Sequence, residues 1–242
     1  EFGTTYQSWC WNDPIVPNGL YSILRSIEFH SFSQILIRFT FLWSILIRPL
    51  LTYYRSEAVI TRLSLAKKPG YCSLASYCRR DSLLLRCPPL SQSIIAYSSP
   101  ALHFLATLFG YLCCIWQQNL DFSNIMWIPL YVFAFIQLLH MIVYTMIELL
   151  QLQNMYVSRV VVRFALIIIF TTTAPSVLTN QTIFFHRKTC HVLLPMVDAL
   201  AEYLCLFSII IFSLLEWSDV WTMEWRTEDR MSLHRDTNVD LS

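Results

Sequence analysis

Charged side chains are scarce in this sequence of 242 residues, where Asp, Glu, Lys and Arg together make up 14% of the chain. Soluble domains contain about 25% of these residues. The few charges gather in short stretches, and the long segments between them carry almost none. A soluble domain of this length would need a charged shell around its core. The distribution is therefore typical of a membrane protein.

Glycine is also rare, with four residues in the chain, and no glycine-rich phosphate-binding loop is present. The sequence has no G-x-S-x-G nucleophile motif, no H-E-x-x-H zinc motif and no H-x-x-x-x-D acyltransferase motif. The net charge of +1 gives no sign of nucleic-acid binding, and neither a basic helix nor a zinc-finger spacing occurs. We expect no soluble catalytic domain, no metal and no other cofactor.

Long apolar runs are what the chain has in abundance: apolar residues reach 55%, and the mean hydropathy is +0.48. A helix that crosses the hydrocarbon core needs roughly 20 such residues. Runs of this length do not alternate as barrel strands do, so helices are expected. The sequence predicts an all-α polytopic bundle with five transmembrane helices, at 35–54, 94–116, 125–150, 160–178 and 192–216.

Lys and Arg are unevenly distributed between these helices, and seven of them lie in the loop 55–93. Positive charge favours the cytosolic side. We therefore place the loops 55–93 and 151–159 and the tail 217–242 in the cytosol. Segments 1–34, 117–124 and 179–191 then face the lumen. This topology gives the cytosolic side eleven Lys and Arg residues and the lumenal side three.

Cys10 and Cys190 both fall on the predicted lumenal side, where an oxidising compartment allows a disulfide between them. The other six cysteines are cytosolic or intramembrane and are expected to be reduced. Three of them lie in the loop 55–93, and their spacing matches no zinc template. Asn180 begins a glycosylation motif, but it is so close to the membrane that we expect no modification.

Ionisable residues interrupt the predicted helices, and each is a candidate site residue because a charge at depth is costly. Arg38 and Arg48 are ten residues apart on the first helix, which places them on one broad face. His103 and His140 lie near the middle of the second and third helices. Asp198 is four residues before Glu202, on the last helix.

His140, Tyr144 and Glu148 are four residues apart and form one polar stripe. We expect a polar cavity open to the lumenal leaflet, in which Arg38, His140 and Glu202 hold a lipid head group or a carbonyl undergoing acyl transfer. The alternative is that these residues hold the helices together through ion pairs and hydrogen bonds. Three further charged residues near helix ends are interpreted as interfacial: Glu148, Arg163 and Glu216.

Several motifs match a known family. Cys10 is followed by a Pro-containing stretch at 11–17, and Arg38-Phe39 with Arg48 fits a W-R-F…P-R pattern. His140-Met141 fits a His-Met pair, and a last block keeps its spacing: Cys190, Glu202-Tyr203, Phe212, Trp217 and Asp219. The chain resembles the post-GPI-attachment-to-proteins factor 2 family, which includes the damage-regulated autophagy modulators and the N-terminal domain of Cwh-type wall proteins.

The resemblance implies six helices, so we expect that a first helix upstream of Cys10 is missing from this chain. Three positions depart from the family pattern: Ser44 and Ser213 stand where histidine is expected, and Ile47 where proline is expected.

The implied function is lipid remodelling of GPI-anchored proteins in the Golgi or endoplasmic reticulum, in which a lyso-GPI anchor is reacylated. The chain would act as an enzyme or as an accessory factor, with membrane lipids and GPI-anchored proteins as partners. His140 and Glu202 are the expected catalytic residues, and His140 is the preferred general base. Arg38, Arg48 and Asp198 are the expected lipid- or phosphate-binding residues. The alternative is a non-enzymatic membrane regulator of the autophagy-modulator type, and a transporter or channel is the weaker third class.

Overall fold

The computed structural model describes residues 19–25, 35–36, 39, 47–57, 59–60, 89–115, 127–151, 157–187 and 193–239. Four long helices dominate these residues: α6 (Pro89–Ile115), α7 (Trp127–Gln151), α8 (Val157–Arg187) and α9 (Met196–Val239). Helical residues at 47–57 and 59–60 (segment 47–60) precede them. The protein is therefore largely helical, as its apolar runs predict.

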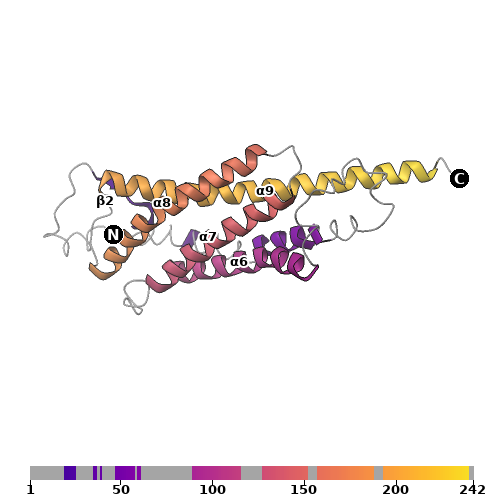
Figure 1. The fold of residues 1–242 in the computed structure, drawn as a ribbon. Helices are drawn as coiled ribbons and strands as arrows, with labels where there is room; N and C mark the ends of the chain where they lie inside the picture. The colour runs from indigo at the N-terminus through magenta and orange to yellow at the C-terminus, as the bar shows by residue number, and fades with distance from the viewer. Residues whose placement is uncertain are drawn as a thin grey trace.

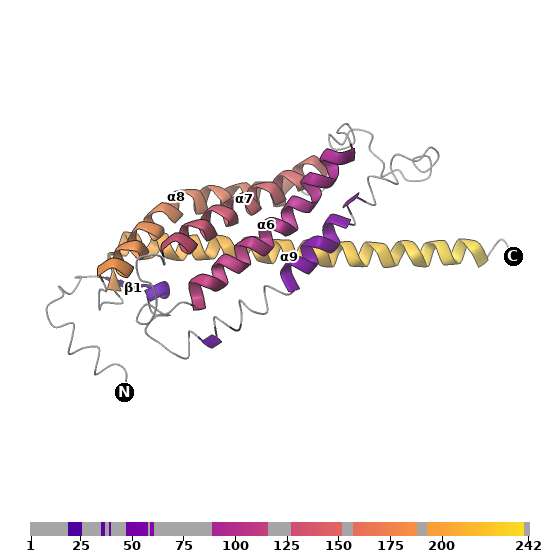
Figure 2. The ribbon, with the colours of Figure 1, turned by 90° about the horizontal axis from the view of Figure 1, so that it is seen from below.

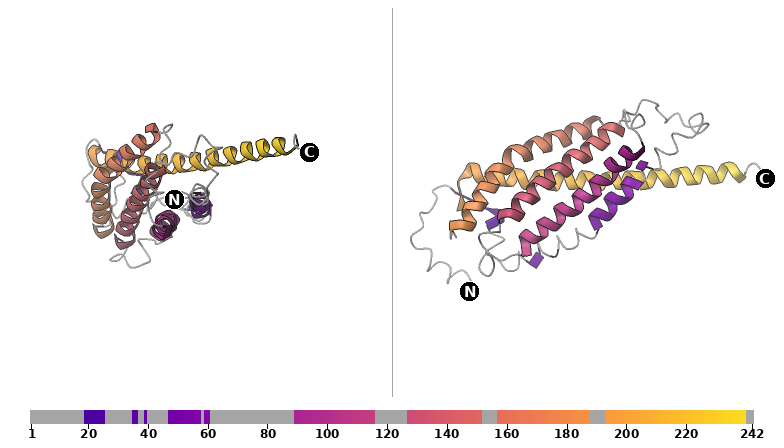
Figure 3. Two further views of the ribbon diagram at one scale, coloured as in Figure 1. Left: turned by 45° about the vertical axis from the view of Figure 1, so that its right-hand side comes forward. Right: turned by 60° about the horizontal axis from the view of Figure 1, so that its bottom comes forward.

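The helices form a bundle in which sequence neighbours pack side by side, α6 with α7, α7 with α8 and α8 with α9 (Figures 1 and 3). Segment 47–60 runs beside α6, and Ser56 Oγ donates a hydrogen bond of 2.7 Å to the carbonyl of Ala96. Arg48 links the same segment to α9, because its guanidinium donates to Ser213 Oγ at 3.2 Å. The 44-residue α9 continues past the bundle toward the C-terminus (Figure 2).

A short pair of strands closes one end of the bundle. β1 (Leu20–Tyr21) pairs antiparallel with β2 (Leu193–Leu194), with Leu20 opposite Leu194. α9 begins directly after β2. We call this end of the bundle the β end, and it also contains the start of α7 and the end of α8 (Figure 1). The strand pair ties the N-terminal part of the described chain to the first turn of α9.

Three helices are long and apolar enough to cross a membrane within the described residues: Trp127–Leu149, Ser158–Phe184 and Met196–Asp219. Only 33%, 28% and 28% of these spans are buried by the protein itself. Large apolar side chains such as Phe135, Ile168 and Leu214 point outward. Water would not tolerate such a surface, whereas lipid would. The chain is a helical membrane protein.

Hydroxyl groups on the outward face of α8 are satisfied within the helix. Thr171 Oγ1 donates to the carbonyl of Ile167 at 2.7 Å, and Thr172 Oγ1 donates to that of Ile168 at 3.0 Å. Such bonds to the preceding turn let threonine face lipid without an unsatisfied polar group. This explains how a Thr-Thr-Thr run is accommodated in a span.

The helix ends differ from the predicted boundaries in three places. Helix α8 continues to Arg187 rather than ending at residue 178, so Asn180 lies in a helix. Most of the predicted tail 217–242 is helical, because α9 extends to Val239. Segment 47–60 passes the predicted end at residue 54, and Arg55, expected in a cytosolic loop, is buried.

The predicted spans 35–54 and 94–116 are not among the three found in the described part of the chain. Much of 35–54 lies outside the described residues. Helix α6 covers the second range, but its first half is rich in serine. Helical structure there agrees with the prediction, and the number of five spans remains a prediction.

Candidate functional site

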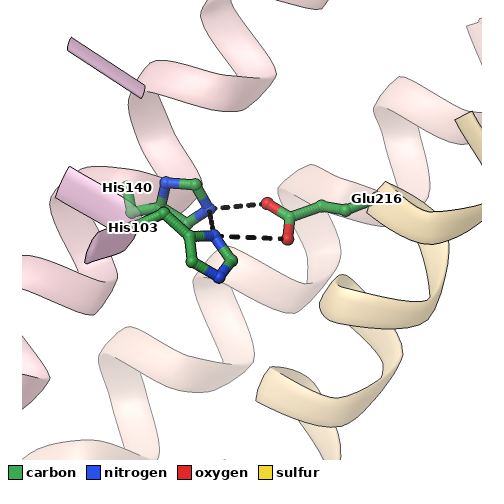
Figure 4. Close-up of side chains that lie close together, drawn as sticks. All are labelled: His103, His140 and Glu216. Atoms are coloured by element: carbon green, nitrogen blue, oxygen red, sulfur yellow. Dashed lines mark hydrogen bonds and ion pairs between the residues drawn. The ribbon is translucent and has the colours of Figure 1, made fainter. Parts of the chain in front are cut away.

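Three titratable side chains from three helices meet in the bundle interior: His103 of α6, His140 of α7 and Glu216 of α9 (Figure 4). His140 Nε2 lies 2.6 Å from Glu216 Oε1 and 3.0 Å from His103 Nδ1. His103 Nδ1 lies 3.7 Å from Glu216 Oε2. All three residues are buried, and His140 is completely enclosed. We call this group the His-His-Glu cluster.

The two histidines meet because α6 and α7 form an antiparallel hairpin. Helix α6 ends at Ile115 and α7 begins at Trp127, so the hairpin has its midpoint at residue 121. His103 lies 18 residues before this midpoint and His140 19 residues after it. Residues at equal distances from the turn of such a hairpin come opposite each other, since both helices rise by about 1.5 Å per residue.

Backbone and aromatic contacts fix the His140 ring. Its Nδ1 lies 3.3 Å from the carbonyl of Ser99, which can only accept a hydrogen bond, so Nδ1 is the donor. The rings of Tyr144 and Phe212 pack on it at centroid distances of 5.8 and 6.4 Å. With Nδ1 donating to Ser99, Nε2 is directed at Glu216 and His103. This bond orients the ring in the way that a positioned base or ligand requires.

A small pocket borders the cluster on the side of segment 47–60. The residues around it are Thr52, Arg55, Ser56, Val59, Ala96, Ser99, Tyr144 and Ile147. Ser99 connects pocket and cluster, because its carbonyl contacts His140 while its side chain lines the pocket. Ser99 Oγ is buried and finds no hydrogen-bond partner among the described residues. A polar group of a bound molecule would satisfy it.

A network of ion pairs lies next to the cluster, around Asp219 one turn further along α9. Asp219 accepts hydrogen bonds from Arg159 at 3.1 Å, from Tyr144 at 3.1 Å and from Arg163. Arg163 also pairs with Glu148, and it is completely buried. The guanidinium groups of Arg55 and Arg163 lie 3.7 and 4.8 Å from the centre of the Tyr144 ring.

A second buried polar cluster lies at the β end. Glu202 accepts hydrogen bonds from Ser22 Oγ at 2.7 Å and from the backbone N–H of Leu24 at 2.8 Å. Arg25 lies over the ring of Phe184 at 5.0 Å. Burial lowers the pKa of the Arg25 guanidinium below its usual value, and Glu202 with Asp198 opposes that shift. Through its hydrogen bonds with Ser22 and Leu24, Glu202 attaches the segment after β1 to α9.

The structure divides the predicted site residues between these two clusters. His140 belongs to the His-His-Glu cluster, and Arg48 donates a hydrogen bond to Ser213, one turn before Glu216 on α9. Glu202 lies at the β end, where Asp198 accepts a 3.0 Å hydrogen bond from Ser176. The polar stripe of His140, Tyr144 and Glu148 is confirmed, since all three side chains contact α8 or α9. The remaining predicted site residues lie outside the described residues: Arg38, Cys10 and Cys190.

His140 and Glu202 do not meet, which corrects the expectation of one cavity that holds both. Glu216, the partner of His140, is 14 residues after Glu202 on the unbroken helix α9. Fourteen residues correspond to about 21 Å along a helix axis. Side chains cannot bridge this distance, so the two residues serve different clusters.

Sequence reasoning missed the buried role of the charged residues near the helix ends. Glu216 and Arg163 were interpreted as interfacial, whereas they are buried at the centre of the polar contacts, and Glu148 pairs with Arg163. The nearly equal distances of His103 and His140 from the hairpin midpoint are a sequence signal that predicts their contact. No sequence signal of this kind predicts the position of Glu216, because that position depends on how α9 packs against the α6–α7 hairpin.

We expect the substitution Glu202→Ala to loosen the β end. It would leave Ser22 Oγ and the Leu24 N–H without their acceptor, and hydrogen bonds to a charged group contribute about 1.5–3 kcal/mol each. The measurement is hydrogen exchange of segment 20–25 in detergent, where protection should fall. Leu204→Ala, on an outward face of the same helix, should leave protection unchanged. Equal protection in both variants would contradict the assignment.

Comparisons with known protein families, with characterised proteins and with solved structures find no match to this chain. The site must therefore be interpreted from its own chemistry. A buried imidazole that is fixed through Nδ1 and contacts a carboxylate through Nε2 is suited to move a proton. Two imidazole nitrogens and a carboxylate that face one point are also suited to hold a transition-metal ion.

Proposed function

We propose that this protein takes part in GPI-anchor lipid remodelling in the secretory pathway, as an enzyme or accessory factor in the reacylation of lyso-GPI-anchored proteins. Its partners in this proposal are membrane lipids and GPI-anchored proteins. The proposal starts from the family resemblance of the sequence, and it is supported by where the resembling residues lie in the bundle.

One observation carries the proposal: most described residues that carry the resemblance are buried in the two polar clusters or pack against them. His140 and Met141 are completely enclosed, and so is Phe212, which packs on His140. Glu202 and Asp219 are buried partners of other segments. Phe39 and Trp217 are exceptions, with 66% and 52% of their surfaces exposed. A polar residue inside the membrane costs free energy and so indicates a functional role, whereas an apolar residue on the outward face of a span needs only to suit lipid.

The chemistry in this proposal is acyl transfer assisted by His140 as the general base. Glu216 takes the place beside His140 that was expected of Glu202, because it is the carboxylate that contacts the ring. Arg48 is a described cation suited to hold a phosphate or an oxyanion, and it contacts Ser213, one turn before Glu216 on α9. Glu202 and Asp198 remain candidates for the lipid head group at the β end, which faces the lumen in the predicted topology.

The topology in this proposal has five transmembrane helices and a cytosolic C-terminus, in the membrane of the Golgi or endoplasmic reticulum. The β end would then lie at the lumenal surface. The extension of α9 beyond Asp219 would run into the cytosol. This extension carries the three arginines of the predicted tail, which fits the preference of positive charge for that side.

The test is a lipid analysis of GPI anchors from cells with and without the protein. We expect cells that lack it to accumulate lyso-GPI anchors and to lose GPI-anchored proteins from their surface. Re-expression of the protein should restore both. Unchanged anchors would contradict the proposal, and altered autophagic flux with normal anchors would favour a regulator of the autophagy-modulator type instead.

A further inference from the structure

We propose that the His-His-Glu cluster is a binding site for a divalent transition-metal ion, with zinc as the best match. His103 Nδ1, His140 Nε2 and one Glu216 oxygen are its three protein ligands. The inference does not rest on the proposed function in lipid remodelling, but it replaces the base role of His140, because Nε2 cannot bind the ion and accept a proton at the same time.

The contact between His140 and Glu216 requires a positive centre. Nδ1 of His140 donates to the Ser99 carbonyl, so a neutral ring has a bare lone pair on Nε2. This lone pair faces a carboxylate oxygen at 2.6 Å. Two lone pairs so close repel each other unless a proton or a metal ion lies between them.

The position of His103 favours the metal ion over the proton. A proton on His140 Nε2 would bond to one partner well, yet two atoms approach that nitrogen, Glu216 Oε1 at 2.6 Å and His103 Nδ1 at 3.0 Å, and Nδ1 also offers a lone pair in the tautomer that carries its proton on Nε2. A metal ion binds all three atoms at once. The candidate ligand atoms lie within 4.8 Å of one another, on side chains that converge on one point (Figure 4).

The distances suit a zinc ion. Zinc binds imidazole nitrogen and carboxylate oxygen at about 2.0–2.2 Å in tetrahedral geometry, which places the ligand atoms about 3.3 Å apart. His140 Nε2 lies 2.6 Å from Glu216 Oε1 and 3.0 Å from His103 Nδ1, both somewhat below that value, and His103 Nδ1 lies 3.7 Å from the other oxygen, Glu216 Oε2. Small side-chain shifts would therefore admit the ion. The bond from His140 Nδ1 to a backbone carbonyl is the outer contact that fixes metal-bound histidines.

Three protein ligands leave a fourth position for water or substrate, as in catalytic zinc sites. The small pocket lined by Ser99 and Tyr144 adjoins the cluster through these two residues, both of which contact His140. The sequence predicted no metal because the ligands follow no local motif: His103 and His140 are 37 residues apart, and His140 and Glu216 are 76. The three helices that carry them assemble the site.

The experiment is metal analysis of the full chain, purified in detergent with a tag that contains no histidine. We expect about one zinc ion per chain by mass spectrometry of the elements. The variants His103→Ala, His140→Ala and Glu216→Gln should each lose most of it. Glu202→Gln is the matched control, a buried carboxylate of the same helix in the other cluster, and it should keep the metal.

A second measurement keeps the test decisive if a variant fails to fold. Cobalt bound to the unaltered protein should give the absorption bands of a tetrahedral site with nitrogen and oxygen ligands. Less than about a tenth of a zinc ion per unaltered chain after growth with added metal would overturn the proposal. So would zinc that persists in folded variants of all three ligands, because the ion would then lie elsewhere.

Discussion

Replacing Arg163 with methionine is expected to cost about 3–5 kcal/mol of stability, the typical loss when one partner of a buried ion pair is removed. Arg163 is completely buried and pairs with both Glu148 and Asp219. Methionine keeps most of the volume but removes the charge, so Glu148 loses its ion pair with Arg163 in a medium of low polarity, whereas Asp219 retains Arg55 and Arg159. The measurement is thermal unfolding in detergent, where the midpoint should fall by about 10 °C.

Arg159 provides the matched control, since it lies one turn earlier on α8 and contacts the same carboxylate of Asp219. Its side chain is 29% exposed, so solvent can replace the lost contact. Arg159→Met should therefore cost about 1 kcal/mol or less. The double variant Arg163→Met with Glu148→Gln should recover part of the loss, because one uncompensated carboxylate is removed. Similar losses for the two arginines would show that the network does not depend on burial.

Replacing His140 with alanine is expected to abolish anchor remodelling in cells that lack the native protein. A positioned general base accelerates proton transfer by about 10²–10⁴-fold, and alanine removes the ring that is held between Ser99 and Glu216. The measurement is the fraction of lyso-GPI anchors after re-expression at equal protein level. Full rescue by His140→Ala would refute the role of His140 as the base.

Two further variants separate chemistry from packing at this position. The glutamine of His140→Gln can donate a hydrogen bond to Glu216 but cannot act as a base, so this variant should accumulate normally and still fail to rescue. Met146→Ala lies on an outward face of α7 and should rescue fully. Glu202→Gln should retain more activity than His140→Gln, because Glu202 belongs to the β end. A complete loss with Glu202→Gln alone would move the chemistry to that cluster.

The sequence by itself was enough to predict the helical membrane character of this protein and the approximate positions of the helices from α6 to α9. A run of about 20 apolar residues has few alternatives, because only a helix satisfies its own backbone in lipid. Helix ends were less predictable. Arg55 was placed in a loop since it is charged, whereas it is buried beside Asp219 and Tyr144.

The polar stripe of α7 was also predictable, because residues four apart on a helix share a face. What faces that stripe was not. His140 and Glu202 were expected to meet since both are polar and lie within helices, yet depth along each helix decides which side chains meet. The crossing of α9 over the α6–α7 hairpin brings Glu216 to His140 and carries Glu202 to the β end.

Sequence periodicity thus determined that His140, Tyr144 and Glu148 share a face of α7, because periodicity depends on one helix at a time. Only the tertiary structure decided the partners. The His-His-Glu cluster joins residues that are 37 and 76 positions apart, and its geometry depends on the relative shift and tilt of three helices. These quantities arise from packing between helices, which local sequence does not specify.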